Sequence, residues 1–197
     1  MKSTRTYVMT ARADGVAQTR ESILRAAIGL TGRLPLAAVS LAGIADDAGV
    51  SVQTVLRQFG SRDAVIEAAT ELVLSEVTEE LHAPQADLPA AMAVIVDHHE
   101  ARGDMAILLL GQEAGDPHVA RITTLGRAAH RSWVERVFTP VLGGLTRPER
   151  EEMIDMLVVV TDVYTWKILR RDRKLSRKLV EHRMLRLAEI VLSDWMP

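Results

Sequence analysis

The spacing of apolar residues predicts helices along the first part of the chain. A helix is expected from Thr19, where apolar and charged positions separate onto opposite faces, and it ends at Pro35 because proline cannot continue a helix. Two shorter segments with helical spacing follow, and after them a longer amphipathic segment over residues 62–81. The apolar positions of these four segments are Ile23, Ala26, Ala27 and Leu30; Leu41, Ile44, Ala45 and Ala48; Val55 and Phe59; and Ile66, Ala69, Val73, Val77 and Leu81. Residues 1–18 have no such face and are predicted to form a flexible arm.

The two short segments are predicted to form a helix-turn-helix. Ser40 is placed to accept a hydrogen bond at the start of the first helix, and Ser51 is placed to do the same for the second. Gly49 stands between them, where a helix that stops needs a residue in the left-handed conformation. Two short helices that turn sharply against each other in this way are typical of DNA-binding domains.

Beyond Pro89 the pattern predicts helices and no strand. We expect helices at about 89–102, 104–114, 117–138, 147–171 and 175–194, divided by glycines, prolines and a basic run at 170–174. Between Asp155 and Lys167 the only formal charge is Asp162, so apolar side chains point in all directions around that helix. A helix that is apolar all round must be covered all round. The helices at about 147–171 and 175–194 are therefore predicted to pair with their copies in a homodimer.

The N-terminal pattern resembles the DNA-binding domain of the TetR family of bacterial transcriptional regulators. The resemblance covers Thr19 to Glu67, with matches at Ser40-Leu41, Ile44-Ala45, Ala48-Gly49-Val50-Ser51, Thr54, Phe59 and Ser61-Arg62. The chain departs from the family at Leu56, where a tyrosine often contacts a phosphate, and at Val52-Gln53, where Lys-Gly is common. The resemblance implies an all-α fold with an N-terminal three-helix helix-turn-helix unit at 19–66 and a C-terminal helical ligand-binding and dimerisation domain at 67–197.

Composition and charge are consistent with this organisation. Hydrophobic residues make up 48% of the chain and charged residues 25%, as in ordinary globular proteins, and there is no cysteine to form disulfides or to bind zinc. No export signal and no membrane-spanning segment is recognisable, so a cytoplasmic protein without a membrane partner is expected. The net charge is -2, yet residues 1–66 contain eight basic and five acidic residues. This modest basic excess predicts that DNA affinity depends on dimerisation and groove contacts as well as on charge.

The second short helix supplies the candidate DNA-reading residues. Val55 and Phe59 are expected to face inward and to leave the opposite face free. Glutamine can pair with adenine, arginine with guanine or phosphate, and valine or threonine with a thymine methyl group. The predicted DNA-contacting residues are Ser40, Ser51, Val52, Gln53, Thr54, Arg57 and Arg62. A dimer would place two such helices one DNA turn apart, roughly 34 to 36 Å, and would read a near-palindrome.

The second domain is predicted to bind a small, largely apolar effector. Pockets for small molecules are mostly apolar with a few polar groups, and the helices between residues 89 and 170 offer both. The candidate ligand-binding residues are Met92, His99, Met105, Leu109, Gln112, His130, Val159, Asp162 and Trp166. The alternative for each of them is a role in core packing or at the surface.

Catalytic and metal chemistry are not indicated by the sequence. His98 and His99 are adjacent and point about 100° apart on a helix, and no HxxxH or HExxH pair is present. The chain also lacks a glycine-framed nucleophile and a glycine-rich phosphate loop. We therefore expect no enzyme activity, no cofactor and no metal. The favoured function is a ligand-responsive homodimeric repressor, and the alternative is a helical ligand-binding or interaction protein with a degenerate DNA-binding domain.

Overall fold

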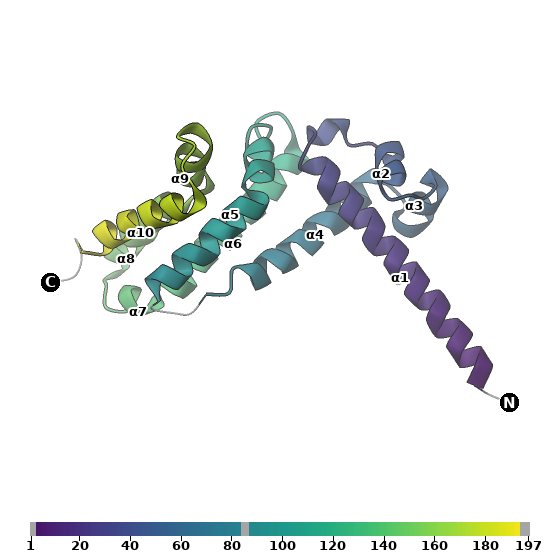
Figure 1. Ribbon diagram of the computed structural model, residues 1–197, viewed down its shortest axis with the longest axis horizontal. Coiled ribbons are helices and arrows are strands. Elements are labelled where there is room, and N and C mark those ends of the chain that lie inside the picture. The colour runs from purple at the N-terminus through teal and green to yellow at the C-terminus, as the bar shows by residue number, and fades with distance from the viewer. Residues whose placement is uncertain (1–2, 84–86, 194–197) are drawn as a thin grey trace. The chain divides into compact units, whose positions relative to one another are not determined.

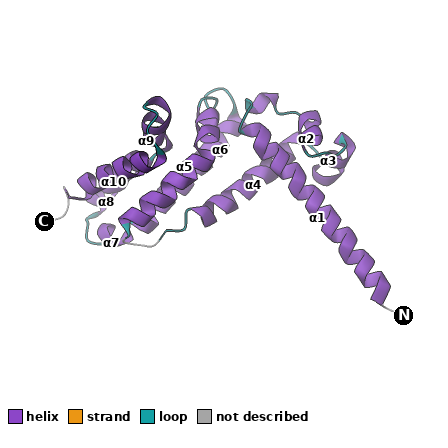
Figure 2. Ribbon diagram, viewed as in Figure 1, coloured by secondary structure: helices purple, strands orange, loops and turns teal. Residues whose placement is uncertain are grey.

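The computed structural model describes residues 3–83 and 87–193, and within these ranges the chain is helical and contains no strand (Figure 2). The all-α class predicted from the sequence is confirmed. The chain separates into two compact units between Val73 and Leu74, inside helix α4 (Arg62–Glu80). The domain boundary predicted at residues 66 and 67 also lies inside this continuous helix.

The first unit consists of short helices packed on the C-terminal half of a long one (Figure 1). Its elements are α1 (Ser3–Thr31), the 3₁₀ turn η1 (Leu36–Ala38), α2 (Leu41–Asp47), α3 (Val52–Phe59) and the start of α4. Helix α2 packs against both α1 and α3. The fully buried side chains include Ile23, Leu36, Ile44, Val55 and Val65, so each of these five elements contributes to one small core.

Helix α1 begins much earlier than the sequence predicted. The segment expected to be a flexible arm is helical from Ser3 onward. The described side chains before Ile23 are exposed or half-buried, so the buried face does start close to the predicted position. The sequence did not reveal this longer helix because backbone hydrogen bonds within a helix need no apolar face, and residues 3–31 contain no proline to stop them.

The second unit is a helical bundle. Its elements after α4 are α5 (Leu88–Leu110), α6 (Pro117–Val137), α7 (Thr139–Leu142), α8 (Arg147–Thr161), α9 (Val163–Lys167), the π-helical turn η2 (Ile168–Asp172) and α10 (Arg177–Ser193). Helix α6 packs against α5 and α8, and α10 packs against the same two helices (Figure 1). Buried side chains such as Met92, Trp133, Leu157 and Met184 fill the space between these helices. Position 194 of the predicted last helix lies outside the described residues.

Gly103 does not divide α5, although the sequence predicted two helices separated there. The reason is a close contact from a distant part of the chain. A Cβ atom at position 103 would lie 2.5 Å from Cζ3 of Trp166, so only glycine admits the indole ring at this point. The glycine serves close packing between α5 and α9, and its cost in helix propensity is about 1 kcal/mol.

The helix predicted at 147–171 is interrupted at Asp162. The backbone of Asp162 is extended, with ψ at 153°, and its carboxylate accepts a hydrogen bond of 2.8 Å from the backbone N–H of Tyr164. Asp162 therefore ends α8 and caps the start of α9. None of the described helices is long and apolar enough to cross a membrane.

Candidate functional site

The helix-turn-helix has the caps that the sequence predicted. The Ser40 hydroxyl accepts a hydrogen bond of 3.1 Å from the Gly43 N–H, and the Ser51 hydroxyl accepts one of 3.1 Å from the Thr54 N–H. Gly49 adopts φ of 65°, the left-handed conformation required after α2. These three positions fix the angle at which α3 leaves α2.

Helix α3 presents the face that the sequence predicted. Val55 is fully buried and anchors the helix, whereas Val52, Gln53 and Arg57 are exposed. Thr54 is half-buried, and its hydroxyl lies 2.9 Å from that of Ser51. The outward residues include a carboxamide and a guanidinium, which are the groups suited to read base edges in a major groove.

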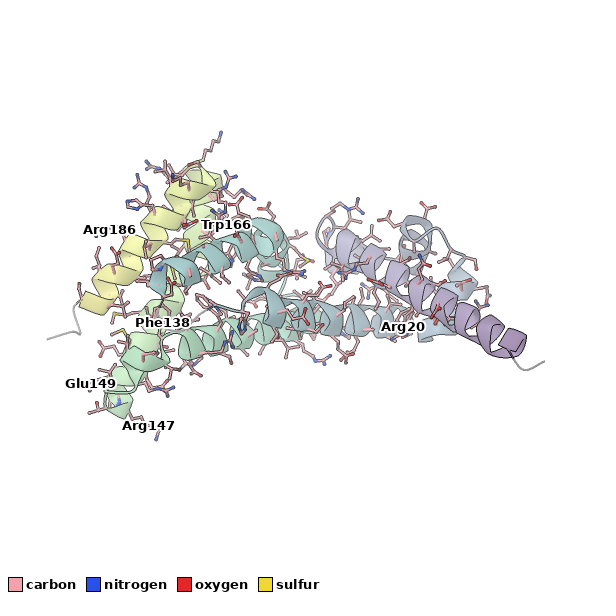
Figure 3. All side chains as sticks on the ribbon, turned by 60° about the horizontal axis from the view of Figure 1, so that its bottom comes forward. Arg20, Phe138, Arg147, Glu149, Trp166 and Arg186 are labelled. Carbon is pink, nitrogen blue, oxygen red and sulfur yellow. The ribbon has the colours of Figure 1, made fainter. Side chains whose placement is uncertain are left out.

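The end of α3 is attached to α1 by a contact that the sequence analysis missed. The guanidinium carbon of Arg20 lies 4.2 Å from the centre of the half-buried Phe59 ring. Figure 3 labels Arg20 on α1. A cation over an aromatic face contributes about 0.5 to 1 kcal/mol at a partly exposed site. The pair lies far apart in the sequence, so no local pattern indicated it.

Arg62 was predicted to contact DNA, but its guanidinium is occupied within the protein. Its Nε donates a hydrogen bond of 2.5 Å to the Val39 carbonyl, a terminal nitrogen donates to the Leu36 carbonyl, and the other lies 3.0 Å from the Asp63 carboxylate. Arg62 therefore fastens the η1 turn to the start of α4. The sequence did not reveal this role because two of its three acceptors are backbone carbonyls of a distant turn.

The predicted ligand-binding residues fall into three groups. Four are buried, four are half-buried, and Val159 is 64% exposed. The buried residues are Met92, His99, Leu109 and Trp166, and the half-buried residues are Met105, Gln112, His130 and Asp162. Val159 does not line the interior of this unit, so that prediction was wrong. Gln112 donates a hydrogen bond of 2.6 Å back to the Leu108 carbonyl of its own helix.

Two of the predicted histidines meet at the end of α8. Nε2 of His99 lies 2.9 Å from the Thr161 carbonyl oxygen, and Nε2 of His130 lies 2.9 Å from the Thr161 hydroxyl. Because a carbonyl can only accept, the proton of His99 is on Nε2. Burial lowers the pKa of His99 to about 3 and the pKa of His130 to about 4, so both rings are neutral near pH 7.

The Thr161 hydroxyl also fixes the proton of His130. This hydroxyl donates its single hydrogen to the Leu157 carbonyl at 2.6 Å. It must therefore accept from Nε2 of His130, and Nδ1 of that ring carries no proton. The Asp162 carboxylate is 3.9 Å from Nδ1, too far for a hydrogen bond. The structure thus brings together the predicted residues His99, His130 and Asp162 around the break between α8 and α9.

Trp166 is held by two groups that the sequence analysis did not select. Its indole N–H donates a hydrogen bond of 3.0 Å to Glu100, and the guanidinium carbon of Arg171 lies 4.4 Å from the centre of its ring. Arg170 in turn donates to the same carboxylate of Glu100 at 2.7 Å. Figure 3 labels Trp166, which lies in α9. These contacts attach α9 and η2 to α5.

A second polar cluster joins α5 to the end of α4. The Arg102 guanidinium donates hydrogen bonds of 2.9 Å to both Glu80 and Glu76, and Nδ1 of His98 lies 3.2 Å from Glu80. The hydrogen bond from Arg102 is the main cause that holds the pKa of Glu80 below its usual value. Among the described residues, no group of three acidic or histidine side chains is arranged to hold a metal ion.

Comparisons with known proteins support the N-terminal helix-turn-helix unit and the all-α fold. Residues 23–69 match the model of a family described as bacterial regulatory proteins, tetR family. A comparison with curated proteins found no match. A transcriptional regulator from Rhodococcus sp. is similar in structure with a TM-score of 0.68 and 21% sequence identity, over 90% of this chain and 99% of that one.

A second solved structure leads to the same assignment. The TetR transcription regulator from Haloarcula marismortui has a TM-score of 0.62 and 16% identity, over 92% of this chain and 100% of that one. Identities this low establish a shared fold, and this fold extends along nearly the whole chain. Together with the match of residues 23–69, it shows that the chain carries an N-terminal domain of the tetR family of bacterial regulatory proteins and has the fold of such regulators.

Proposed function

We propose that the protein is a transcriptional repressor that binds a near-palindromic operator as a homodimer and leaves it when a small effector binds. The observation that carries this proposal is the exposed face of α3. Its residues Gln53 and Arg57 point outward from a helix that is anchored by Val55 and capped by Ser51. A helix held in this way can enter a major groove without losing its own core contacts.

The DNA contacts we propose follow from chemistry and exposure. Gln53 and Arg57 would read base edges, and Val52 would touch a thymine methyl group. Ser40, Ser51 and Thr54 lie at the starts of α2 and α3, where free backbone N–H groups favour phosphate. Arg62 is assigned to the scaffold instead, because its donors have acceptors within the protein.

The homodimer is supported by apolar residues that the single chain leaves exposed. Six of the nine large hydrophobic residues exposed in the described part of the chain lie in α8, α9, η2 and α10. They are Val159, Tyr164, Ile168, Leu179, Leu187 and Ile190. Apolar patches of this kind mark protein–protein contacts. We propose that they pair with the same residues of a second chain.

Helix α10 has a second apolar side that its own chain leaves exposed. Val180, Met184 and Ala188 recur every four residues and are fully buried inside the unit. Leu179 and Ile190 lie on a different side of the helix, because successive residues turn by about 100°. The helix therefore has one apolar side for its own chain and one for a partner.

The effector response is proposed from the composition of the second unit. Buried apolar residues surround a few polar groups there, namely His99, His130 and Asp162 at the break between α8 and α9. An effector that binds one conformation more tightly shifts the population toward it, and operator affinity changes accordingly. A regulator of this kind acts in the cytoplasm, and we assign it no catalytic activity.

Selection of bound fragments from a genomic DNA library tests this function. The full chain is incubated with fragments at fixed salt, and the retained fragments are sequenced. Enrichment of a near-palindrome is the expected result. If no sequence is enriched while the protein remains folded and dimeric, the proposal fails in favour of a helical interaction protein with a degenerate DNA-binding domain.

A further inference from the structure

Trp133 on α6 contains a buried hydrogen-bond donor without an acceptor. The residue is fully buried, and no group of the described chain accepts from its Nε1–H. Leaving such a donor unsatisfied costs about 1 to 3 kcal/mol, and native proteins rarely do so without a reason. The other described tryptophan, Trp166, is equally buried but donates to Glu100. The contrast indicates that the environment of Trp133 suits an acceptor that the protein itself does not supply.

Two aromatic rings lie against Trp133. The His130 ring is stacked with its centre 6.1 Å away and its plane tilted by 22°, and the Phe138 ring meets the indole edge-on at 6.4 Å. Figure 3 labels Phe138, which follows the last residue of α6. A buried water usually makes about three hydrogen bonds to polar groups. An organic ligand can instead pack against these two rings while its oxygen accepts from the indole N–H.

The polar groups beside the neighbouring His130 ring have partners of their own. Nε2 of His130 donates to the Thr161 hydroxyl, and that hydroxyl donates to Leu157. The Asp162 carboxylate accepts from the Tyr164 N–H at the start of α9. None of these groups accepts from Trp133, and neither does the unprotonated Nδ1 of His130, so the described chain supplies no acceptor for this donor.

The charges near His130 favour a neutral ligand over a charged one. His99 and His130 carry no charge near pH 7 because burial depresses the pKa of both rings. The formal charge closest to His130 is the negative carboxylate of Asp162, 3.9 Å from Nδ1. Arg131, the adjacent cation on α6, is paired with Glu151 and Asp155. An anionic ligand would find no partner for its charge here, whereas a ketone, ester or ether oxygen needs only the indole donor.

We propose that Nε1 of Trp133 is the donor that recognises a neutral oxygen acceptor on a small, largely apolar effector. The proposal rests on the effector response proposed above and specifies the chemistry of its ligand. His130 connects this position to Thr161, the last residue of α8. The break at Asp162 separates Val159 from Tyr164, both of which belong to the proposed dimer face. A ligand beside Trp133 therefore lies one side chain away from the segment that shapes that face.

Indole N–H signals in the NMR spectrum of the ¹⁵N-labelled full chain test the proposal. The chain has three tryptophans, and Trp133→Phe assigns the signal of interest. Acetophenone, α-methylstyrene and benzoate serve as probes. The first two have the same shape, with a carbonyl oxygen in one and a methylene group in the other, and the third carries a negative charge. We expect acetophenone to move the Trp133 proton signal downfield in a saturable manner, and benzoate to leave it in place.

The decisive quantity is the ratio of the affinities for the two neutral probes, acetophenone and α-methylstyrene. A neutral hydrogen bond contributes about 1 kcal/mol, so wild-type protein should bind acetophenone about fivefold more tightly than α-methylstyrene. In Trp133→Phe the ratio should fall to about one. Lost ring volume affects both probes equally and cancels in the ratio. If that variant does not fold, Trp166→Phe and Trp195→Phe assign the Trp133 signal by elimination, and the wild-type spectrum still decides.

Two results would overturn the proposal. One is a wild-type ratio near one, or a ratio that Trp133→Phe does not change. The other is a Trp133 N–H that shows a persistent exchange contact with water and is unaffected by acetophenone, because a resident water then satisfies the donor. Operator binding is measured on the same samples. If the protein binds DNA but fails these tests, only the proposal for Trp133 is contradicted. If it binds acetophenone through Trp133 but does not bind DNA, the proposed regulator function is contradicted.

Discussion

Gly103 is the residue whose replacement should reveal the packing of the second unit most clearly. A methyl group there would meet the Trp166 ring at 2.5 Å, and the ring is held on its other sides by Glu100 and Arg171. We expect Gly103→Ala to lower the free energy of unfolding by about 1 to 3 kcal/mol through overpacking. Urea titration followed by circular dichroism measures the change.

Gly126 provides the matched control at the same scale. It is an exposed glycine inside α6, and a Cβ atom there would meet nothing within 4 Å. Gly126→Ala should stabilise the protein by about 0.5 to 1 kcal/mol because alanine favours the helix. Equal effects of the two substitutions would contradict the close contact between Gly103 and Trp166.

The buried histidines predict a loss of stability in mild acid. His99 and His130 have folded pKa values of about 3 and about 4, below the value of 6.5 for an unfolded histidine. Between these values the unfolded chain binds more protons, so stability is complete above pH 6.5 and falls as the pH decreases. The slope approaches about 1.4 kcal/mol per pH unit for each histidine. His130→Gln should remove one histidine's share of the slope between pH 6.5 and 5, and an unchanged slope would contradict the assignment.

At the scale of elements, the arginines of the first unit divide into one that holds the scaffold and one on the proposed DNA-reading surface. Arg62 donates to two backbone carbonyls of the η1 region, whereas Arg57 is exposed on α3. Arg62→Ala should therefore lower the free energy of unfolding by about 1.5 to 3 kcal/mol, the range for hydrogen bonds from a charged group. Arg57→Ala should weaken operator binding with little change in the melting temperature. Calorimetry and a salt-controlled shift assay separate the two, and a reversed pattern would refute the division.

The elements also show what the sequence was able to predict. The caps at Ser40 and Ser51 and the turn at Gly49 were predicted correctly because each depends on residues within a few positions. The continuity of α5 through Gly103 was not predicted. The glycine there makes room for an indole ring of another helix, and no local pattern indicates that contact.

For the site residues, local sequence patterns predicted which side chains are exposed better than they predicted which groups those side chains contact. The outward face of α3 followed from helical periodicity, with Val55 inside and Arg57 outside. The occupied guanidinium of Arg62 and the unpartnered indole of Trp133 depend on contacts that only the folded chain defines. Val159 was misplaced because an apolar residue in an apolar helix was assigned to the interior.

At the scale of the whole molecule, the proposed dimer should depend on the exposed face of α10. Ile190 is 58% exposed there, although it is apolar. We expect Ile190→Lys to convert the dimer to a monomer at micromolar concentration, because a pair of ammonium groups would be buried at the interface. Leu34→Lys changes a residue of similar character, 38% exposed in the first unit, and should leave the dimer intact. Light scattering after size-exclusion chromatography gives the masses, and an Ile190→Lys dimer would contradict the proposed interface.

The central claim is that two copies of α3 read one operator, and fluorescence anisotropy with the selected duplex tests it most directly. Wild-type protein is titrated at one fixed salt concentration onto the near-palindrome, onto one half-site, and onto a scrambled duplex. The account predicts two chains per palindrome and an affinity about 10³-fold or more above that for the scrambled duplex. Equal affinities for the palindrome and the scrambled duplex, or saturation by one chain, would contradict it.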